Sequence, residues 1–247
     1  MSNCIPLRVG VGGMGSGGWY VARDGKPICP FTSGEICAQW CAAFLGISHK
    51  KGLMGNILSF VATKAGTGTS TLARAFAVEA AYSLNLLIVD LDDRERASWQ
   101  WGQRRLANNW DPPVRVETAQ PHDLLGKAAS VELCVADAPP NGEVSAEWLA
   151  RRSILTVVAT GCGFEEIDGA IALMQALARS GIADQHLALA LCRVERSANA
   201  ERARDYLSKT WCNVLQGHIP ESRSFHDLQC EGQAVTESPV SYLIPNA

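Results

Sequence analysis

The residues with the most evident chemistry lie in a glycine-rich segment that follows a short apolar run. The run covers residues 56–62, and residues 63–71 read TKAGTGTST. Gly66 and Gly68 allow backbone N–H groups to approach an anion, and Ser70 can offer its hydroxyl to Mg²⁺. Between a strand and a helix such a segment predicts a phosphate site, and the alternative is an ordinary glycine-rich turn.

Three aspartates follow later apolar runs. Asp90 and Asp92 come after LLIV, and Asp137 ends the apolar part of VELCVADAPP. Two carboxylates two residues apart at a strand end can hold a metal ion or its water, and a single aspartate in that place is the usual outer ligand of nucleotide-bound Mg²⁺. Each alone could be a surface carboxylate, whereas the glycine-rich segment and the two acidic segments, in this order at successive strand ends, predict a site for Mg²⁺ and a nucleotide.

A sheet of parallel strands is needed to bring these residues together. From residue 56 onward, short apolar runs alternate with helical patterns. The predicted strands are 56–62, 86–89, 114–116, 133–136, 154–159 and 187–191, and the predicted helices are 70–83, 97–108, 165–179 and 198–209. This alternation predicts an α/β fold whose parallel sheet is covered on both faces. Ligands bind at the carboxyl ends of such strands, where the glycine-rich segment and the aspartates stand.

The first 54 residues differ from the rest, and we predict a domain boundary after them. Residues 1–18 are rich in glycine, and GWYVARDGKPICPF predicts a hairpin that turns at Asp24-Gly25. A helix is expected from the capping sequence TSGE to about Leu45. This small ββα unit resembles the GYF-type modules of bacterial proteins, and the alternative is an extension that packs on the larger domain, residues 55–247.

Composition limits the classes of protein to consider. The 247 residues are 47% hydrophobic and carry a net charge of −3, enough for one core and a small appendage. No apolar run is long enough to span a bilayer and no secretory signal is recognised, so a cytoplasmic protein is expected. Residues 1–54 carry a net charge of +3 and the remainder −6, which disfavours nucleic acid unless a local basic patch exists.

The nine cysteines are scattered without a CxxC pair. Cys29, Cys37, Cys41 and His49 could be imagined as metal ligands, but their spacing matches no common zinc pattern. We therefore expect buried free thiols in a reducing compartment.

From Gly55 to about Glu237 the chain resembles the ParA/MinD superfamily of deviant P-loop ATPases. The stretch KAGTGTST is similar to the family loop xKGGxGK(S/T)T, LLIVDLDDRERASWQWGQRR to VLLIDLDPQGSASxWxxRR, and CVADAPP to VIIDTPP. HIPESRSFHDLQCEGQAVTES is similar to the ending of partition proteins. The resemblance implies a three-layer P-loop NTPase fold, ATP and Mg²⁺ as cofactors, and a homodimer that forms with nucleotide. It further implies a partition or positioning role with a ParB-type adaptor, non-specific DNA as a further partner, and no membrane.

The resemblance also implies roles for individual residues. Lys64 falls on the signature lysine that reaches the nucleotide of the partner subunit, and Asp92 falls on the aspartate that orients the attacking water. The metal ligands would be Ser70 and Asp137, with Asp90 in the water shell of the metal. The implied nucleotide-binding residues are Lys64, Ala65, Gly66, Thr67, Gly68, Thr69, Ser70, Thr71, Cys192 and Arg193.

Two departures from the family pattern weaken these expectations. Thr69 replaces the lysine that grips the phosphates within one subunit, so hydrolysis is expected to be slow and binding weak. Cys192 stands where the family usually has an asparagine that reads adenine. Two functions therefore stay open: a ParA-like partition or positioning ATPase, and a non-catalytic regulator or scaffold, for example of a secretion or conjugation machine.

A basic patch for DNA is a further hypothesis. The arginines that could contact phosphates are Arg193, Arg196, Arg202, Arg204 and Arg223. Acidic residues slightly outnumber basic ones after Leu191, so the sequence leaves DNA binding open.

Overall fold

The computed structural model describes residues 22–23, 26–27, 55–82, 84–140 and 145–238. In the first 54 residues it places two short strands, β1 (Ala22–Arg23) and β2 (Lys26–Pro27), which pair antiparallel with Arg23 opposite Lys26. This pairing agrees with the predicted hairpin. The predicted helix to Leu45, and the cysteines considered as metal ligands, lie outside the described residues.

The main domain is built on a seven-stranded sheet in the order β5-β4-β6-β3-β7-β8-β9, with every neighbouring pair parallel. The strands are β3 (Asn56–Ala62), β4 (Leu86–Asp90), β5 (Arg115–Thr118), β6 (Leu133–Asp137), β7 (Leu155–Thr160), β8 (Leu187–Val194) and β9 (Val214–Pro220). The predicted parallel sheet is confirmed. Because β3 lies between β6 and β7, the segment that follows it leaves from the middle of the sheet.

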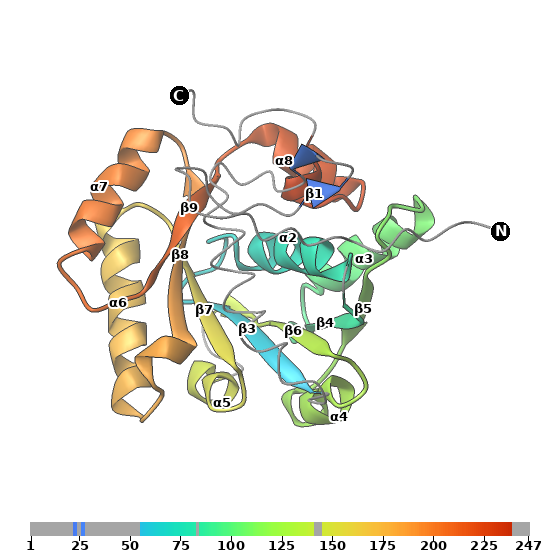
Figure 1. The fold of residues 1–247 in the computed structure, drawn as a ribbon, viewed down its shortest axis with the longest axis horizontal. Helices are drawn as coiled ribbons and strands as arrows, with labels where there is room; N and C mark the ends of the chain where they lie inside the picture. Colours follow the sequence, from blue (N-terminus) through green and yellow to red (C-terminus); the bar gives the residue numbers. More distant parts are fainter. Residues whose placement is uncertain (1–21, 24–25, 28–54, 83, 141–144, 239–247) are drawn as a thin grey trace.

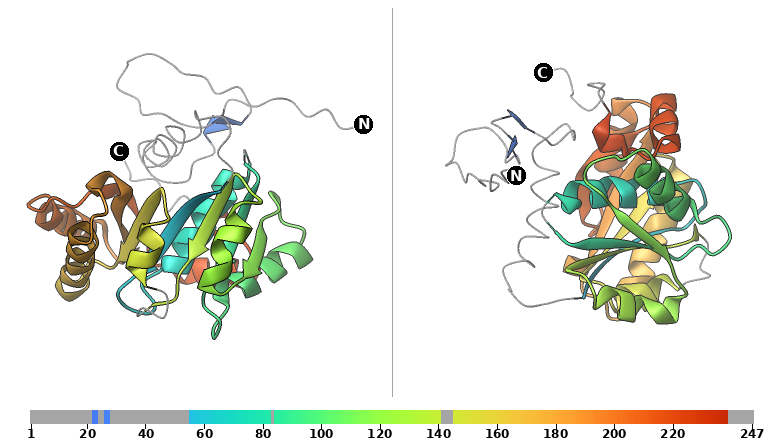
Figure 2. Two further views of the ribbon diagram at one scale, coloured as in Figure 1. Left: turned by 90° about the horizontal axis from the view of Figure 1, so that it is seen from below. Right: turned by 90° about the vertical axis from the view of Figure 1, so that its right-hand side faces the viewer.

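Helices cover both faces of this sheet (Figure 1). They are α2 (Thr69–Ala81), α3 (Ala97–Ala107), α4 (Leu124–Ala128), α5 (Ala146–Ala150), α6 (Phe164–Arg179), α7 (Ser197–Leu207) and α8 (Arg223–Cys230). In the right-hand view of Figure 2, α8 lies above the sheet and α4 below it. None of the helices in the described part of the chain combines the length and apolar character that crossing a bilayer requires.

Two apolar cores form because successive side chains of each strand point to opposite faces. Phe60 of β3 packs with α2, Trp101 of α3 and Phe225 of α8. Val61, the next residue, packs with α4, α5, α6 and α7 on the other face. The predicted three-layer arrangement is therefore confirmed.

Four elements escaped the sequence analysis. Helices α4 and α5 have five residues each, too few to show a helical period. Strand β9 contains Gly217, at φ 68°, and lies at the edge of the sheet with an irregular register against β8. Helix α8 lies in the segment that resembles the ending of partition proteins, a resemblance that by itself predicts no helix. The other elements predicted between residues 56 and 209 match, with bounds that shift by at most three residues.

Helix α3 anchors the end of the described chain. Arg105, 1% exposed, donates to the carbonyls of Pro112 and Gly232 and forms a two-pronged ion pair with Glu237, at 2.8 and 3.0 Å. The indole nitrogen of Trp101 donates to the carbonyl of Gln233 at 2.9 Å. These bonds hold residues 232–237 against α3, where they help to cover the apolar face of α2.

Gly232→Ala tests this anchor. Gly232 has φ +83°, and a Cβ there would lie 2.2 Å from the backbone nitrogen of Arg105. We expect a loss of about 2 kcal/mol or more in the free energy of unfolding, measured by urea denaturation. Gly126→Ala is the matched control, because a Cβ at Gly126 meets nothing within 4 Å and the residue lies in α4. Equal stability of the two variants would contradict the described anchor.

Glu79 makes stability depend on pH. Burial raises the pKa of this carboxyl to about 7, a rise that Glu237 reinforces and the Thr236 hydroxyl opposes. Since the unfolded chain releases this proton near pH 4.5 and the folded chain near 7, stability falls as pH rises through that window. Glu79→Gln should therefore be more stable than the parent at pH 8, by on the order of 2 kcal/mol, and equal to it at pH 4.

The comparison needs urea denaturation at both pH values. Glu201→Gln, on the exposed side of α7, is the control and should match the parent throughout. A constant difference between Glu79→Gln and the parent across the range would show that Glu79 does not titrate in the folded protein as described.

Candidate functional site

The glycine-rich segment forms the loop between β3 and α2. Gly66 and Gly68 have φ values of 73° and 99°, which only glycine adopts without strain, whereas Ala65 is not among the residues with positive φ. The hydroxyl of Thr67 donates to the carbonyl of Lys64 at 2.6 Å and closes the turn. A Cβ at Gly68 would lie 3.1 Å from the Cβ of Cys192. The loop therefore takes the shape that a phosphate cradle needs, at the N-terminus of a helix.

The structure brings all the predicted site residues around one cavity of about 400 Å³ at the carboxyl ends of the strands. The loop residues that line it are Lys64, Ala65, Gly66, Thr67, Gly68, Thr69, Ser70 and Thr71, and the residues from other strand ends are Asp90, Asp92, Asp137, Cys192 and Arg193. Ile219, Pro220 and Phe225 close the opposite wall. The sequence reasoning thus located the cavity, and the roles of its residues stay predictions.

Two buried carboxylates lie side by side at the floor. Asp90 of β4 and Asp137 of β6 occupy paired positions of adjacent strands. The Asp90 oxygens accept hydrogen bonds from the backbone N–H groups of Asp92, at 3.0 Å, and Trp99, at 2.9 Å. Asp137 Oδ2 accepts from the Ser98 hydroxyl at 2.6 Å. Trp99 and Ser98 both belong to the first turn of α3, which the pair therefore positions.

Burial controls the charge of this pair. It raises the pKa of Asp137 to about 6, with a further rise from the negative charge of Asp90, while Arg74 and the hydroxyls of Ser98 and Ser70 lower it. Burial also raises the pKa of Asp90, and the N–H of Trp99 is the strongest opposing influence. Each carboxylate thus costs free energy to keep ionised, and the nearby Arg74 offsets only part of that cost.

The floor of the cavity fits Mg²⁺. Asp137 Oδ1 is buried and has no hydrogen-bond partner among the described residues, and Ser70 stands beside it at the start of α2. No cluster of three or more acidic, histidine or cysteine side chains in the described part of the chain could hold a metal alone. Mg²⁺ commonly takes one or two protein oxygens and completes its shell with water and substrate phosphates. A hydroxyl and one free carboxylate oxygen match that donor set.

Lys64 and Arg193 are the two cations predicted to contact the nucleotide, and in this structure both contact other residues of the chain. Lys64 lies 4.0 Å from a carboxylate oxygen of Glu165, and its side chain is 55% exposed. Arg193 donates from Nη1 to the carbonyl of Gly66 at 3.0 Å and from Nε to Glu221 at 2.9 Å. Arg193 thus fixes the loop from the side of β8, and Lys64 stays at the rim.

Asp92 and Cys192 serve the local structure in different ways. Asp92 is half-buried at the rim, and its Oδ1 accepts the N–H groups of Arg94 and Glu95, both at 3.0 Å. Cys192 is fully buried beneath Gly68, and burial raises the pKa of its thiol to about 12. It therefore supports the loop from below, whereas the carboxylate of Asp92 closes the turn that follows β4.

Sequence reasoning missed Arg74. This residue follows Ser70 by one turn of α2, lines the cavity and is 7% exposed. Its Nε donates to the Ser98 hydroxyl at 3.0 Å and its Nη1 to the side-chain oxygen of Gln229 at 2.9 Å. Burial lowers the pKa of Arg74, and Asp137 and Asp90 raise it. The only signal in the sequence was an arginine among the apolar residues of LARAFAV.

The proposed DNA patch is smaller than predicted. Arg204 donates to the carbonyls of Leu215 and Gly217 and thereby joins α7 to β9, and Arg193 holds the loop. Arg196, Arg202 and Arg223 are the exposed members that remain.

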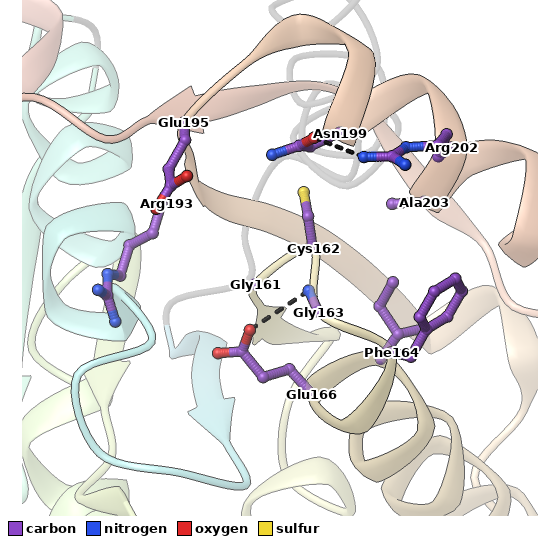
Figure 3. A pocket seen from close by; sticks show the side chains of 11 residues that line it. Gly161, Cys162, Gly163, Phe164, Glu166, Arg193, Glu195, Asn199, Arg202 and Ala203 are labelled. Carbon is purple, nitrogen blue, oxygen red and sulfur yellow. Dashed lines mark hydrogen bonds between the residues drawn. The ribbon is translucent and has the colours of Figure 1, made fainter.

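A second cavity, of about 350 Å³, lies between the beginnings of α6 and α7 (Figure 3). Its polar groups largely satisfy one another. Glu166 accepts the N–H of Gly163 at 3.4 Å, and Arg202 donates to the side chain of Asn199 at 2.9 Å. The guanidinium of Arg193 points away from this cavity and toward the loop after β3. We assign no ligand to this second cavity.

Comparison with known proteins supports the fold. No family model matches the chain, and no curated protein matches it in sequence. Solved structures do match. A ParA family ATPase from Chlorobium tepidum TLS is 14% identical with a TM-score of 0.60, and covers 76% of this chain and 95% of its own.

Two further structures contain nucleotides. The septum site-determining protein MinD of Pyrococcus horikoshii OT3, complexed with Mg-ADP, is 16% identical with a TM-score of 0.58 and covers 76% of this chain and 91% of its own. The ATP complex of Cyanothece McdA is 12% identical with a TM-score of 0.61, and the match covers 78% of this chain and 93% of the McdA chain. The chain therefore has the three-layer fold of the ParA and MinD ATPases, as predicted.

Thr69→Lys tests the loop. Thr69 begins α2 and lines the cavity, so a lysine there would place an ammonium group beside bound phosphates. A charge-assisted contact of this kind contributes roughly 1.5–3 kcal/mol, so the affinity for Mg-ATP should rise about ten- to a hundredfold in calorimetry. Gln103→Lys, on the exposed side of α3, adds the same charge and should leave the affinity unchanged. Unaltered binding by Thr69→Lys would mean that the loop does not hold phosphates.

Proposed function

We propose that this chain, which has the fold of the ParA and MinD ATPases, binds ATP with Mg²⁺ in the cavity beside the loop of residues 63–71. The observation that carries the proposal is the buried oxygen of Asp137, unpartnered among the described residues, below a glycine loop and a helix N-terminus. Backbone N–H groups of the loop hold the phosphates. Ser70 and Asp137 would hold the metal, and Asp90 would bind one of its waters.

Two further residues of the cavity, Asp92 and Thr69, favour slow hydrolysis of ATP. Mg²⁺, when bound, neutralises charge on the phosphates and polarises the bond that breaks. Asp92, half-buried at the rim of the cavity, would orient the attacking water. Thr69 brings no positive charge to the transferred phosphoryl group, which deprives the transition state of a stabilising cation. Turnover is therefore slow compared with that of relatives that carry the lysine.

At the level of the cell, the proposal is a ParA-like partition or positioning protein. Two subunits join face to face across their nucleotides, and Lys64 leaves Glu165 to reach the phosphates of the partner. A ParB-type adaptor is the partner that the family resemblance implies. Arg196, Arg202 and Arg223 are exposed and available for non-specific contact with DNA phosphates.

A second function has its own support in this site. Thr69 lacks a charge, and Cys192 is buried under the loop where it cannot present a polar group to a base. Both features favour a non-catalytic regulator or scaffold that keeps the fold as a binding platform. ATP turnover with excess Mg²⁺ separates the two functions, because a regulator would bind nucleotide without releasing phosphate.

Lys64→Ala tests the dimer. Two triphosphates brought face to face repel one another, and Lys64 is the loop cation that could offset this repulsion. The variant should lose the dimers that ATP induces and keep the thermal stability of the monomer, since the side chain is largely exposed. Light scattering with and without ATP measures the dimer fraction.

Lys209→Ala, at an exposed position after α7, removes the same charge and should dimerise as the parent does. Equal dimer fractions in Lys64→Ala and the parent, or dimers that form without nucleotide, would contradict the ATP-dependent dimer and favour the scaffold.

A further inference from the structure

Arg74 is held rigidly beneath the loop. Its guanidinium donates to Ser98 in α3 and to Gln229 in α8, and it lies 5.9 Å from the centre of the Trp101 ring. Gln229 in turn accepts from the hydroxyl of Thr71 at 3.2 Å. Three helices thus fix one cation in one place, so its charge needs no rearrangement when a ligand arrives.

The partners of this cation are the two carboxylates of the floor. Ser98 accepts from Arg74 and donates to Asp137, which joins the guanidinium to the carboxylate through one hydroxyl. Asp90 lies beside Asp137 on the neighbouring strand. When both acids are ionised, Asp90, Asp137 and Arg74 together carry one net negative charge. Without Arg74 the two carboxylates would carry two negative charges.

The other cations of the cavity lie at its rim and are engaged there. Lys64 is 4.0 Å from Glu165 and Arg193 is 2.9 Å from Glu221, and both side chains are more than half exposed. Thr69 contributes no charge. Among the described residues that line this cavity, Arg74 is therefore the buried cation, and solvent screens it least.

We propose that Arg74 supplies, from within the fold, much of the positive charge that Mg²⁺ would otherwise have to bring to the acidic floor, so that a nucleoside triphosphate binds here with little dependence on divalent metal. This inference rests on the proposed function. Two uncompensated carboxylates would repel a polyphosphate, and Arg74 offsets one of them in a weakly screened place. Binding and hydrolysis then have different requirements, because the metal is still needed to polarise the phosphate.

The test compares nucleotide affinity with and without metal. ATP labelled with N-methylanthraniloyl is titrated into the full chain in excess Mg²⁺ and again in EDTA, and fluorescence anisotropy gives the two dissociation constants. For the parent protein their ratio should be below about tenfold. Arg74→Met keeps much of the apolar stem and removes the charge. Relative to the parent, its loss of ATP affinity should be at least about tenfold larger in EDTA than in Mg²⁺.

Two variants separate the buried charge from packing and from net charge. Arg74→Lys keeps the charge and should keep the low ratio, even if its thermal stability falls. Arg104→Met removes an exposed charge of α3 within electrostatic reach of Arg74, and should behave as the parent. If Arg74→Met does not fold, as judged by its melting curve, Arg74→Gln, which also removes the charge but keeps a polar end, takes its place with the same expected loss in EDTA.

Several results would overturn the inference. A parent protein that loses more than about tenfold in affinity on removal of Mg²⁺ depends on metal in the ordinary way. A folded Arg74→Met with the ratio of the parent would show that the guanidinium has no such effect. Absence of binding in both solutions would contradict the proposed function itself, and the inference with it.

Discussion

The burial of two carboxylates at adjacent strand ends is the constraint on which the rest of the site depends. Asp90 and Asp137 occupy paired positions in β4 and β6, where the apolar strands leave little water to solvate them. Charged groups persist in such a place only when hydrogen bonds and opposite charge compensate them. Backbone N–H groups, the Ser98 hydroxyl and the Arg74 guanidinium provide that compensation.

These compensating contacts also determine where the surrounding helices lie. Helix α3 begins where Ser98 and the N–H of Trp99 meet the acidic pair, and α8 is joined to α2 through the side chain of Gln229. Further along α3, Arg105 holds the end of the described chain through Glu237. The cavity and the C-terminal segment are therefore both held by side chains of α3. A change in the cavity has a physical route to the surface of α8.

Much of this arrangement could be predicted from the sequence because it is local. Apolar runs predicted β3, β4 and β6, and the residues after them predicted the loop and both carboxylates. The contacts of Arg74 could not be predicted, since Gln229 lies 155 residues away and only the fold brings it near. The burial of Cys192 depends on how β8 passes under Gly68, which no local pattern encodes. Strand β9 and the short helices α4 and α5 carry too weak a pattern to be read from residues alone.

Hydrogen–deuterium exchange of the backbone amides, with and without ATP, tests nucleotide binding at this loop most directly. If the phosphates rest on residues 63–71, the amides from Gly66 to Ser70 should exchange more slowly with ATP, because each N–H that bonds a phosphate is withdrawn from water. Slower exchange should extend to the segment between Asp90 and Trp99, which borders the same cavity. Unchanged exchange in the loop at saturating ATP, or protection confined to the cavity between α6 and α7, would contradict the proposed site.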